Sequence, residues 1–192
     1  MGQYYKPVNL KNKQWVYSHD IKEKCTGHDG KTYMMGSGLK LMEHSWMKNS
    51  FVKSIESLLI PGGAWHKQPI VWAGDYAPEE QNLTLNIFSM CEEENADKKI
   101  KPKPLKGKYN FIVNHTKKEY VDKRKVPDKD GWQIHPLPLL TCEGNGQGGG
   151  DFRGDSKLVG KWARDIISVE KDIKVIGKGF IAIDRELLEG YK

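Results

Sequence analysis

Acidic residues near the ends of predicted strands are the first candidates for chemistry. Glu43 lies near the end of the alternating segment 38–46, and Asp75 lies near the end of the alternating segment 71–76. Alternate side chains of a strand point to one face, so each acid continues the apolar face of its own strand. If the two strands are neighbours, the carboxylates meet at one sheet edge and can act as an acid–base pair. The competing interpretation is that each acid caps a turn or pairs with a lysine.

A glycine-rich segment, residues 143–156, carries a second group of candidates. Asp151, Arg153 and Asp155 alternate within it, and two carboxylates with a guanidinium can hold a metal ion or a polar ligand. The competing interpretation is that Arg153 pairs with both acids and orders the loop. A Gly-x-Gly-x-x-Gly spacing at 144–149 is not followed by a long helix, so a dinucleotide site is not indicated. We expect no cofactor and no metal, and we expect this loop to line a cleft shared with the first half of the chain.

Two tryptophans stand close to the first pair of acids. Trp46 follows Glu43, and Trp72 precedes Asp75, so both are candidates for a binding surface. The candidate ligand-binding residues are therefore Glu43, Trp46, Trp72, Asp75, Asp151, Arg153 and Asp155.

Composition excludes several classes of protein. The chain has 192 residues, of which 38% are hydrophobic and 29% are charged, and this balance is typical of a folded protein rather than a disordered one. No apolar run reaches the roughly 20 residues of a membrane helix, and no secretory signal is found, so we expect a cytoplasmic protein. The 3 cysteines are widely separated and odd in number, which fits a reducing compartment.

Positive charge is concentrated in the middle of the chain. The net charge is +6, and lysines dominate the region from Lys98 to Lys125. Such a region permits nucleic-acid binding, although arginine, the better partner of phosphate, is scarce there. The competing interpretation is a solvated linker followed by a solvated hairpin.

The sequence contains an internal repeat. Residues 2–16 align without gaps with residues 107–121, and Gly, Tyr, Val, Asn and Lys coincide. In both copies a β-prone run ends at Val-Asn and a second run follows a short polar stretch, which predicts a β-hairpin. Trp65 and Trp162 occupy matched positions farther along, so both are expected in the core.

These observations predict an α+β fold with two tandem, pseudo-equivalent lobes that are mainly antiparallel β. The first lobe, residues 1–97, is expected to contain a hairpin, a strand, a helix and two more strands. Residues 98–104 form an exposed linker rich in lysine and proline. The second lobe, residues 105–192, contains the glycine-rich loop in place of the helix. We expect the lobes to join, because the second would otherwise leave its sheet uncovered.

One helix is predicted clearly. It follows Asn49, shows an apolar stripe from Phe51 to Leu59, and stops at the Pro-Gly-Gly of residues 61–63. The runs 85–87 and 137–142 are predicted to be strands.

Several short motifs resemble a known group of proteins. The opening Met-Gly-Gln-Tyr-Tyr at residues 1–5, Gly-Leu-Lys-Leu-Met-Glu at 38–43 and Trp-Ala-Gly-Asp-Tyr at 72–76 resemble small uncharacterised proteins from bacteria and their phages. Some of these proteins also carry a stretch like residues 144–151. The resemblance implies a bacterial or phage cytosolic protein and carries no activity.

The sequence therefore supports three functions. The first is a non-enzymatic binding protein, such as a phage or accessory factor that engages a protein or a small ligand. The second is a hydrolase-like enzyme that uses carboxylates, either Glu43 with Asp75 or Asp151 with Asp155. The third is nucleic-acid binding through the Lys98 to Lys125 region.

Overall fold

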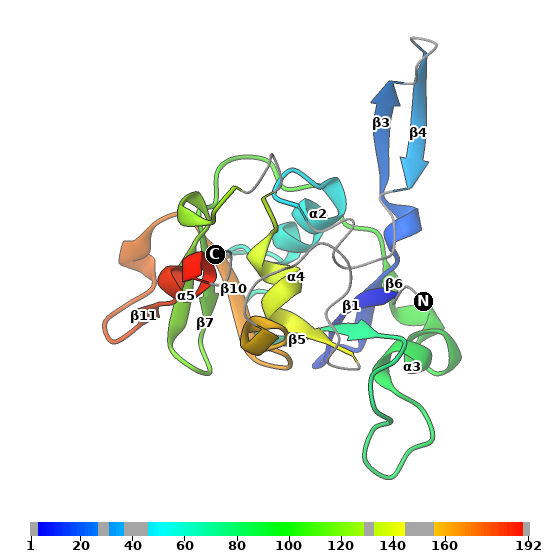
Figure 1. Cartoon of the computed structure of the whole chain (residues 1–192). Helices are drawn as coiled ribbons and strands as arrows, with labels where there is room; N and C mark the ends of the chain where they lie inside the picture. The colour runs from blue at the N-terminus through cyan, green and yellow to red at the C-terminus, as the bar shows by residue number, and fades with distance from the viewer. Residues whose placement is uncertain (1–3, 27–30, 37–45, 129–132, 145–155, 190–192) are drawn as a thin grey trace.

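Nine strands form one mixed sheet in the described part of the chain (Figure 1). The computed structural model describes residues 4–26, 31–36, 46–128, 133–144 and 156–189. In chain order the strands of this sheet are β1 (Tyr5–Asn9), β2 (Gln14–Val16), β5 (Gln68–Gly74), β6 (Lys99–Ile100), β7 (Phe111–Asn114), β8 (Glu119–Asp122), β9 (Cys142–Glu143), β10 (Ile166–Glu170) and β11 (Ile181–Ala182).

The sheet extends in both directions from a seam between β5 and β10. These two strands are antiparallel, and each also pairs antiparallel with the first strand of a hairpin, β1–β2 or β7–β8. The short strands β6 and β11 add in parallel to β2 and β8, so the order is β11-β8-β7-β10-β5-β1-β2-β6. Strand β9 lies parallel to the end of β5. The two predicted hairpins are confirmed, and both halves of the chain share one sheet.

Helices cover the sheet on both faces. They are α2 (Ser50–Leu59), α3 (Ile87–Glu93), α4 (Pro136–Thr141) and α5 (Asp184–Glu189), with short 3-10 turns η1 (Ser18–Asp20), η2 (Ala96–Lys98), η3 (Lys123–Lys125), η4 (Ser156–Leu158) and η5 (Ile173–Val175). Residues of α2, α4 and α5 pack with Ile70 and Trp72 on one face, whereas Cys91 of α3 packs with Val71 and Ala73 on the other. No helix among the described residues has the length and apolar character needed to cross a membrane.

Helix α2 forms where the sequence predicts it. The Asn49 side chain accepts hydrogen bonds from the backbone N–H groups of Phe51 and Val52 at 2.8 and 3.1 Å, which caps the first turn. The apolar stripe is buried, with Ile55 and Leu59 fully inaccessible to solvent. The expected core positions of Trp65 and Trp162 are also confirmed, because both side chains are completely buried.

Three predicted elements differ from the structure. The run 85–87 is not a strand, because the Asn86 side chain accepts from the N–H of Ser89 and so starts α3. The run 137–142 is helical through Thr141: the His135 side chain caps α4, and Pro136 suits its first turn. In the expected linker, Lys99 and Ile100 form β6 beside β2, and Ile100 is partly buried against the core.

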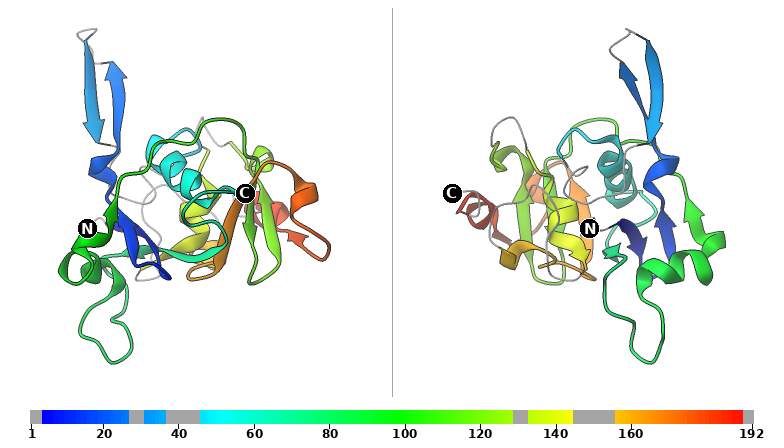
Figure 2. Two further views of the ribbon diagram at one scale, coloured as in Figure 1. Left: turned by 180° about the vertical axis from the view of Figure 1, so that it is seen from behind. Right: turned by 45° about the vertical axis from the view of Figure 1, so that its right-hand side comes forward.

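A hairpin outside the main sheet projects from the body of the molecule. Strands β3 (Lys22–Thr26) and β4 (Thr32–Gly36) pair only with each other, and Figures 1 and 2 show them extending away from the helices and the large sheet. This hairpin was not predicted from the sequence.

The two halves of the sheet make matched contacts. At the seam, the N–H of Lys67 donates to Ile167 and the N–H of Arg164 donates to Ile70, at 3.1 and 2.8 Å. Each half also has a buried tryptophan whose indole N–H donates to the first residue of the second hairpin strand. These bonds are Trp65 to Gln14 at 2.9 Å and Trp162 to Glu119 at 2.6 Å. Outward from the seam, each half of the sheet has the same order of strands: a seam strand, the two strands of a hairpin and a short parallel strand.

Candidate functional site

Three of the predicted site residues lie within the described part of the chain. Trp72 is 2% exposed and packs edge-on against Phe51 with ring centroids 5.6 Å apart, so it is a core residue and not part of a surface. Trp46 is partly buried and forms a bridge with Ile134. Asp75 is partly buried after β5. None of these three residues lines the pocket described below. The other candidates, Glu43, Asp151, Arg153 and Asp155, lie outside the described residues.

Asp75 connects backbone segments. Its carboxylate accepts from the N–H of Tyr4 at 3.1 Å, its own N–H donates to the Tyr4 carbonyl, and its carbonyl accepts from the Asn86 side chain. These contacts are those expected of an acid that closes a turn.

The approach to the glycine-rich segment is tied to the first half of the chain. Glu143 stands in β9 and accepts two hydrogen bonds of 2.6 Å from Arg164, which also donates to Glu80. The predicted cleft beside residues 145–155 lies outside the described residues, so it stays a prediction.

A pocket of about 340 Å³ lies between α2, the segment 105–110 and η3. Its lining comes from both halves of the chain, which is a common location for ligand sites. The lining residues are Met47, Lys53, Glu56, Leu105, Gly107, Lys108, Tyr109, Asn110, Lys123, Arg124 and Gln133. Four of these side chains are cationic and one is anionic.

The anionic residue of the pocket is buried and paired. Glu56 is 3% exposed, and its Oε1 atom accepts from Nζ of Lys123 and from Nε2 of His135, the latter at 3.2 Å. A buried carboxylate is stable only with such partners. Burial by itself would raise the pKa of Glu56, but His135 and Lys123 outweigh it and lower this pKa to about 2.

The bonding of His135 fixes its protonation. Its Nδ1 atom accepts from the N–H of Leu137 at 3.1 Å, so the ring proton is on Nε2 and points to Glu56. Burial lowers the pKa of His135, and Glu56 offsets this only in part, so the ring is neutral near pH 7. Since both ring nitrogens are occupied, His135 has no atom left to take a proton from a substrate.

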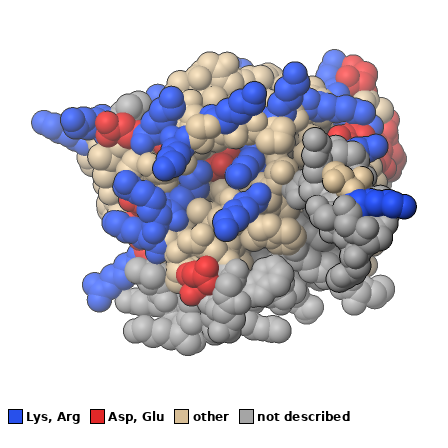
Figure 3. Space-filling view, turned by 90° about the horizontal axis from the view of Figure 1, so that it is seen from above, with Lys and Arg blue, Asp and Glu red and all other residues tan. Residues whose placement is uncertain are grey.

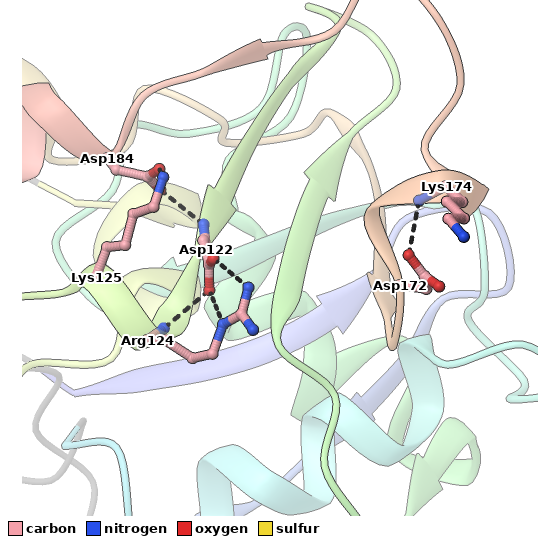
Figure 4. Close-up of polar contacts among 6 residues, drawn as sticks. All are labelled: Asp122, Arg124, Lys125, Asp172, Lys174 and Asp184. Carbon is pink, nitrogen blue, oxygen red and sulfur yellow. Dashed lines mark hydrogen bonds and ion pairs between the residues drawn. The ribbon is translucent and has the colours of Figure 1, made fainter.

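The 3-10 turn η3 also carries Arg124 and Lys125, and carboxylates hold both side chains in place (Figure 4). Asp122 accepts from Nε and Nη2 of Arg124 at 2.8 and 2.6 Å, a two-bond contact that fixes the guanidinium plane. This pairing lowers the pKa of Asp122. Asp184 accepts from the N–H of Asp122 and from Lys125, at 2.7 and 3.0 Å. The carboxylates of Asp122 and Asp184 thus stabilise the turn.

Two lysines of the pocket have no acidic partner in the part of the chain that the structure describes. Among the described residues, neither Lys53 nor Lys108 forms an ion pair. By contrast, Lys123 pairs with Glu56 and Arg124 pairs with Asp122. The N–H of Leu105 donates to the Lys53 carbonyl at 3.0 Å, which ties the segment before β7 to α2. Counted over the described residues and their ion pairs, the pocket therefore carries an excess of two positive charges.

The surface around this region is also basic. In Figure 3, which views the molecule from the side of α2, lysine and arginine side chains clearly outnumber acidic ones. Lys101, Lys103 and Lys106 of the segment before the pocket are exposed. Lys101 is paired with Asp20, as is Lys99.

A serine–histidine pair lies elsewhere in the sheet. The Nε2 atom of His115 is 2.8 Å from the Oγ atom of Ser168, and beside it His66 contacts Glu170 at 3.1 Å. Ser168 is completely buried within β10, so no substrate reaches its hydroxyl in this structure. The pair satisfies polar groups of the sheet face.

Sequence reasoning did not find the pocket. One signal was present: Glu56 falls on the apolar stripe of α2, between Val52 and Leu59, where an acid needs a buried partner. The identity of that partner was not readable, because Lys123 lies in a different element far along the chain. No group of three or more potential metal ligands occurs among the described residues.

Comparisons with known proteins identify no relative. No family model, no curated protein and no solved structure matches this chain.

Proposed function

We propose that this protein is a non-enzymatic binding protein that holds a small anionic ligand in the pocket between α2, the segment 105–110 and η3. The observation that carries the proposal is the charge of the pocket, in which Lys53 and Lys108 lack an acidic partner among the described residues. A concave site with charges of one sign concentrates its field and attracts an ion of opposite sign.

The internal pairing of the pocket supports binding rather than catalysis. Glu56 accepts from two buried donors, and His135 uses both ring nitrogens. A general base needs a free acceptor atom within reach of the substrate proton. These groups instead fix the shape of the pocket and leave the lysines to meet the ligand.

The test is calorimetric titration of the full chain with inorganic sulfate and phosphate. We expect saturable binding that is weakened about tenfold or more in the double variant Lys53→Gln/Lys108→Gln, because two charge-assisted contacts are lost. The matched control is Lys11→Gln/Lys178→Gln, which removes the same charge from exposed positions outside the pocket. Absence of binding, or equal weakening by both double variants, would overturn the proposal.

Nucleic-acid binding is a second candidate, and the exposed lysines 101, 103 and 106 beside the pocket favour it. It predicts that a single-stranded oligonucleotide binds with an affinity that falls steeply with salt. It also predicts that loss of these three lysines weakens binding more than loss of Lys53 and Lys108 does. Fluorescence anisotropy of a labelled oligonucleotide distinguishes the two functions.

We also propose that the chain consists of two pseudo-equivalent units, joined at the seam between β5 and β10, in a cytoplasmic protein of bacterial or phage origin. The matched tryptophan contacts and the reciprocal seam hydrogen bonds support two units. A further match is the side-chain turn in each hairpin: Asn9 accepts from the N–H of Asn12, and Asn114 accepts from the N–H of Lys117, both at 2.9 Å.

A further inference from the structure

We propose that the pocket recognises a phosphate group in its dianionic form, carried on a small molecule. This inference rests on the proposed function, since it names the chemical class of the ligand that the same pocket binds. A phosphate monoester carries a charge near −2 at neutral pH and presents three terminal oxygens as acceptors.

The charges of the pocket do not balance among the described residues. Glu56 neutralises Lys123, Asp122 neutralises Arg124, and His135 is uncharged near pH 7. Lys53 and Lys108 then leave two positive charges without a counter-charge among the described residues. A dianion cancels both, whereas a carboxylate or a sulfate ester, each with a single charge, leaves one lysine uncompensated in the pocket.

The cationic side chains of the pocket are hydrogen-bond donors that suit phosphate. Each lysine ammonium has three N–H donors and no acceptor, which suits an ion that only accepts hydrogen bonds. Asp122 engages Nε and Nη2 of Arg124, so the guanidinium is held by one edge and Nη1 is left to donate to a ligand. Arginine held in this way binds phosphate with defined geometry.

The pocket is small, and its lining is partly apolar. About 340 Å³ is near the lower end of ligand sites, so the pocket matches a small molecule. Met47, Leu105 and Tyr109 supply apolar surface beside the cations, and the amides of Asn110 and Gln133 supply polar groups. A phosphorylated metabolite with a partly polar body matches this lining.

The decisive experiment compares two probes of the same shape and different charge. Methyl phosphate is largely a dianion at pH 7.5, whereas methyl sulfate is a monoanion. We expect calorimetry at pH 7.5 to show methyl phosphate binding about tenfold or more tightly than methyl sulfate. Lowering the pH to 5.0 should weaken methyl phosphate binding about tenfold, because its second pKa is about 6 and roughly a tenth remains dianionic. Inorganic sulfate, a dianion at both pH values, should bind equally at both.

The controls distinguish the inference that the ligand is a phosphate from the proposed function of anion binding. Circular dichroism at pH 5.0 verifies that the fold persists, and Lys53→Gln/Lys108→Gln should abolish the preference for methyl phosphate while Lys11→Gln/Lys178→Gln keeps it. If methyl phosphate and methyl sulfate bind equally, or if the pH has no effect, the phosphate inference is wrong and the anion pocket stands. If none of the three anions binds, the proposed function itself is wrong.

Discussion

Glu56 lies on the buried side of α2, between Val52 and Leu59, and a carboxylate there is costly unless cations accompany it. Lys123 and His135 supply the charge and the hydrogen bond that it needs. These partners come from the second half of the chain, so one residue in a helix of the first half fixes where η3 and α4 meet it. The same pairing removes Lys123 from the charge available to a ligand.

The first prediction concerns this buried pair. Replacing Lys123 with Met should lower the free energy of unfolding by about 3–5 kcal/mol, because Glu56 is left as an uncompensated buried charge. Urea denaturation measures this change. The double variant Lys123→Met/Glu56→Gln should recover most of the loss, since the charge is then removed as well. An equal loss in both variants would show that the pairing of charges is not the cause.

The second prediction concerns pH. The pKa of His135 is lowered from 6.5 in the folded protein, so the unfolded chain binds more protons below pH 6.5 and stability should fall as the pH drops. Glu56, with a pKa lowered from 4.5 to about 2, adds a further loss between these two values. The variant His135→Asn keeps an acceptor for the N–H of Leu137 and removes the titrating ring. Its free energy of unfolding, measured by urea denaturation at several pH values, should depend less on pH between 5 and 6.5. If it falls with pH as steeply as that of the unchanged protein, His135 is not the group responsible.

Among the elements, those with a strong local signal were predictable. Helix α2 has a cap, a regular apolar stripe and a Pro-Gly-Gly stop, and each hairpin has two β-prone runs around a polar turn. Helix α4 was not predictable as a helix, because Leu137 to Thr141 is a short apolar run that suits a strand equally well. The N–H of Leu137 donates to Nδ1 of His135 and so caps the helix, and histidine is not among the residues usually expected at a cap.

The third prediction belongs to α2. Replacing Asn49 with Ala should destabilise the protein by about 1 kcal/mol, since the N–H groups of Phe51 and Val52 lose their acceptor. Urea denaturation again provides the measurement. Asn49→Ser keeps a capping oxygen and should cost clearly less. If serine and alanine are equally destabilising, the cap is not what Asn49 contributes.

At the scale of the whole molecule, the pocket could not be predicted from the sequence. Its residues come from Met47 to Gln133 and meet only because β5 and β10 join the two halves in one sheet. The lysine-rich region contains Lys108, but Lys53, the other lysine of the proposed anion site, lies in α2. The sequence prediction of joined lobes agrees with the single sheet, whereas the candidates Trp72 and Asp75 serve the core and a turn.

The fourth prediction concerns the two pseudo-equivalent units. In a crystal structure of the chain, residues 5–16 with 65–74 should superpose on residues 110–121 with 162–171, and Val8 should lie on Val113 and Trp65 on Trp162. The shared pattern of hairpin, seam strand and tryptophan contact is the physical reason for this expectation. A superposition that places the two tryptophans in unrelated positions would refute a common unit.

The most direct test of the central claim is a residue-resolved binding measurement. The full chain, labelled with nitrogen-15, is titrated with methyl phosphate, and the shifts of its backbone amides are followed by NMR. The anion pocket predicts saturable shifts that cluster at Lys53, at residues 105–110 and at Lys123 and Arg124, with none at the exposed control residues Lys11 and Lys178. Shifts confined to Lys101 and Lys103, or no shifts at millimolar probe, would contradict the claim that this pocket binds an anion.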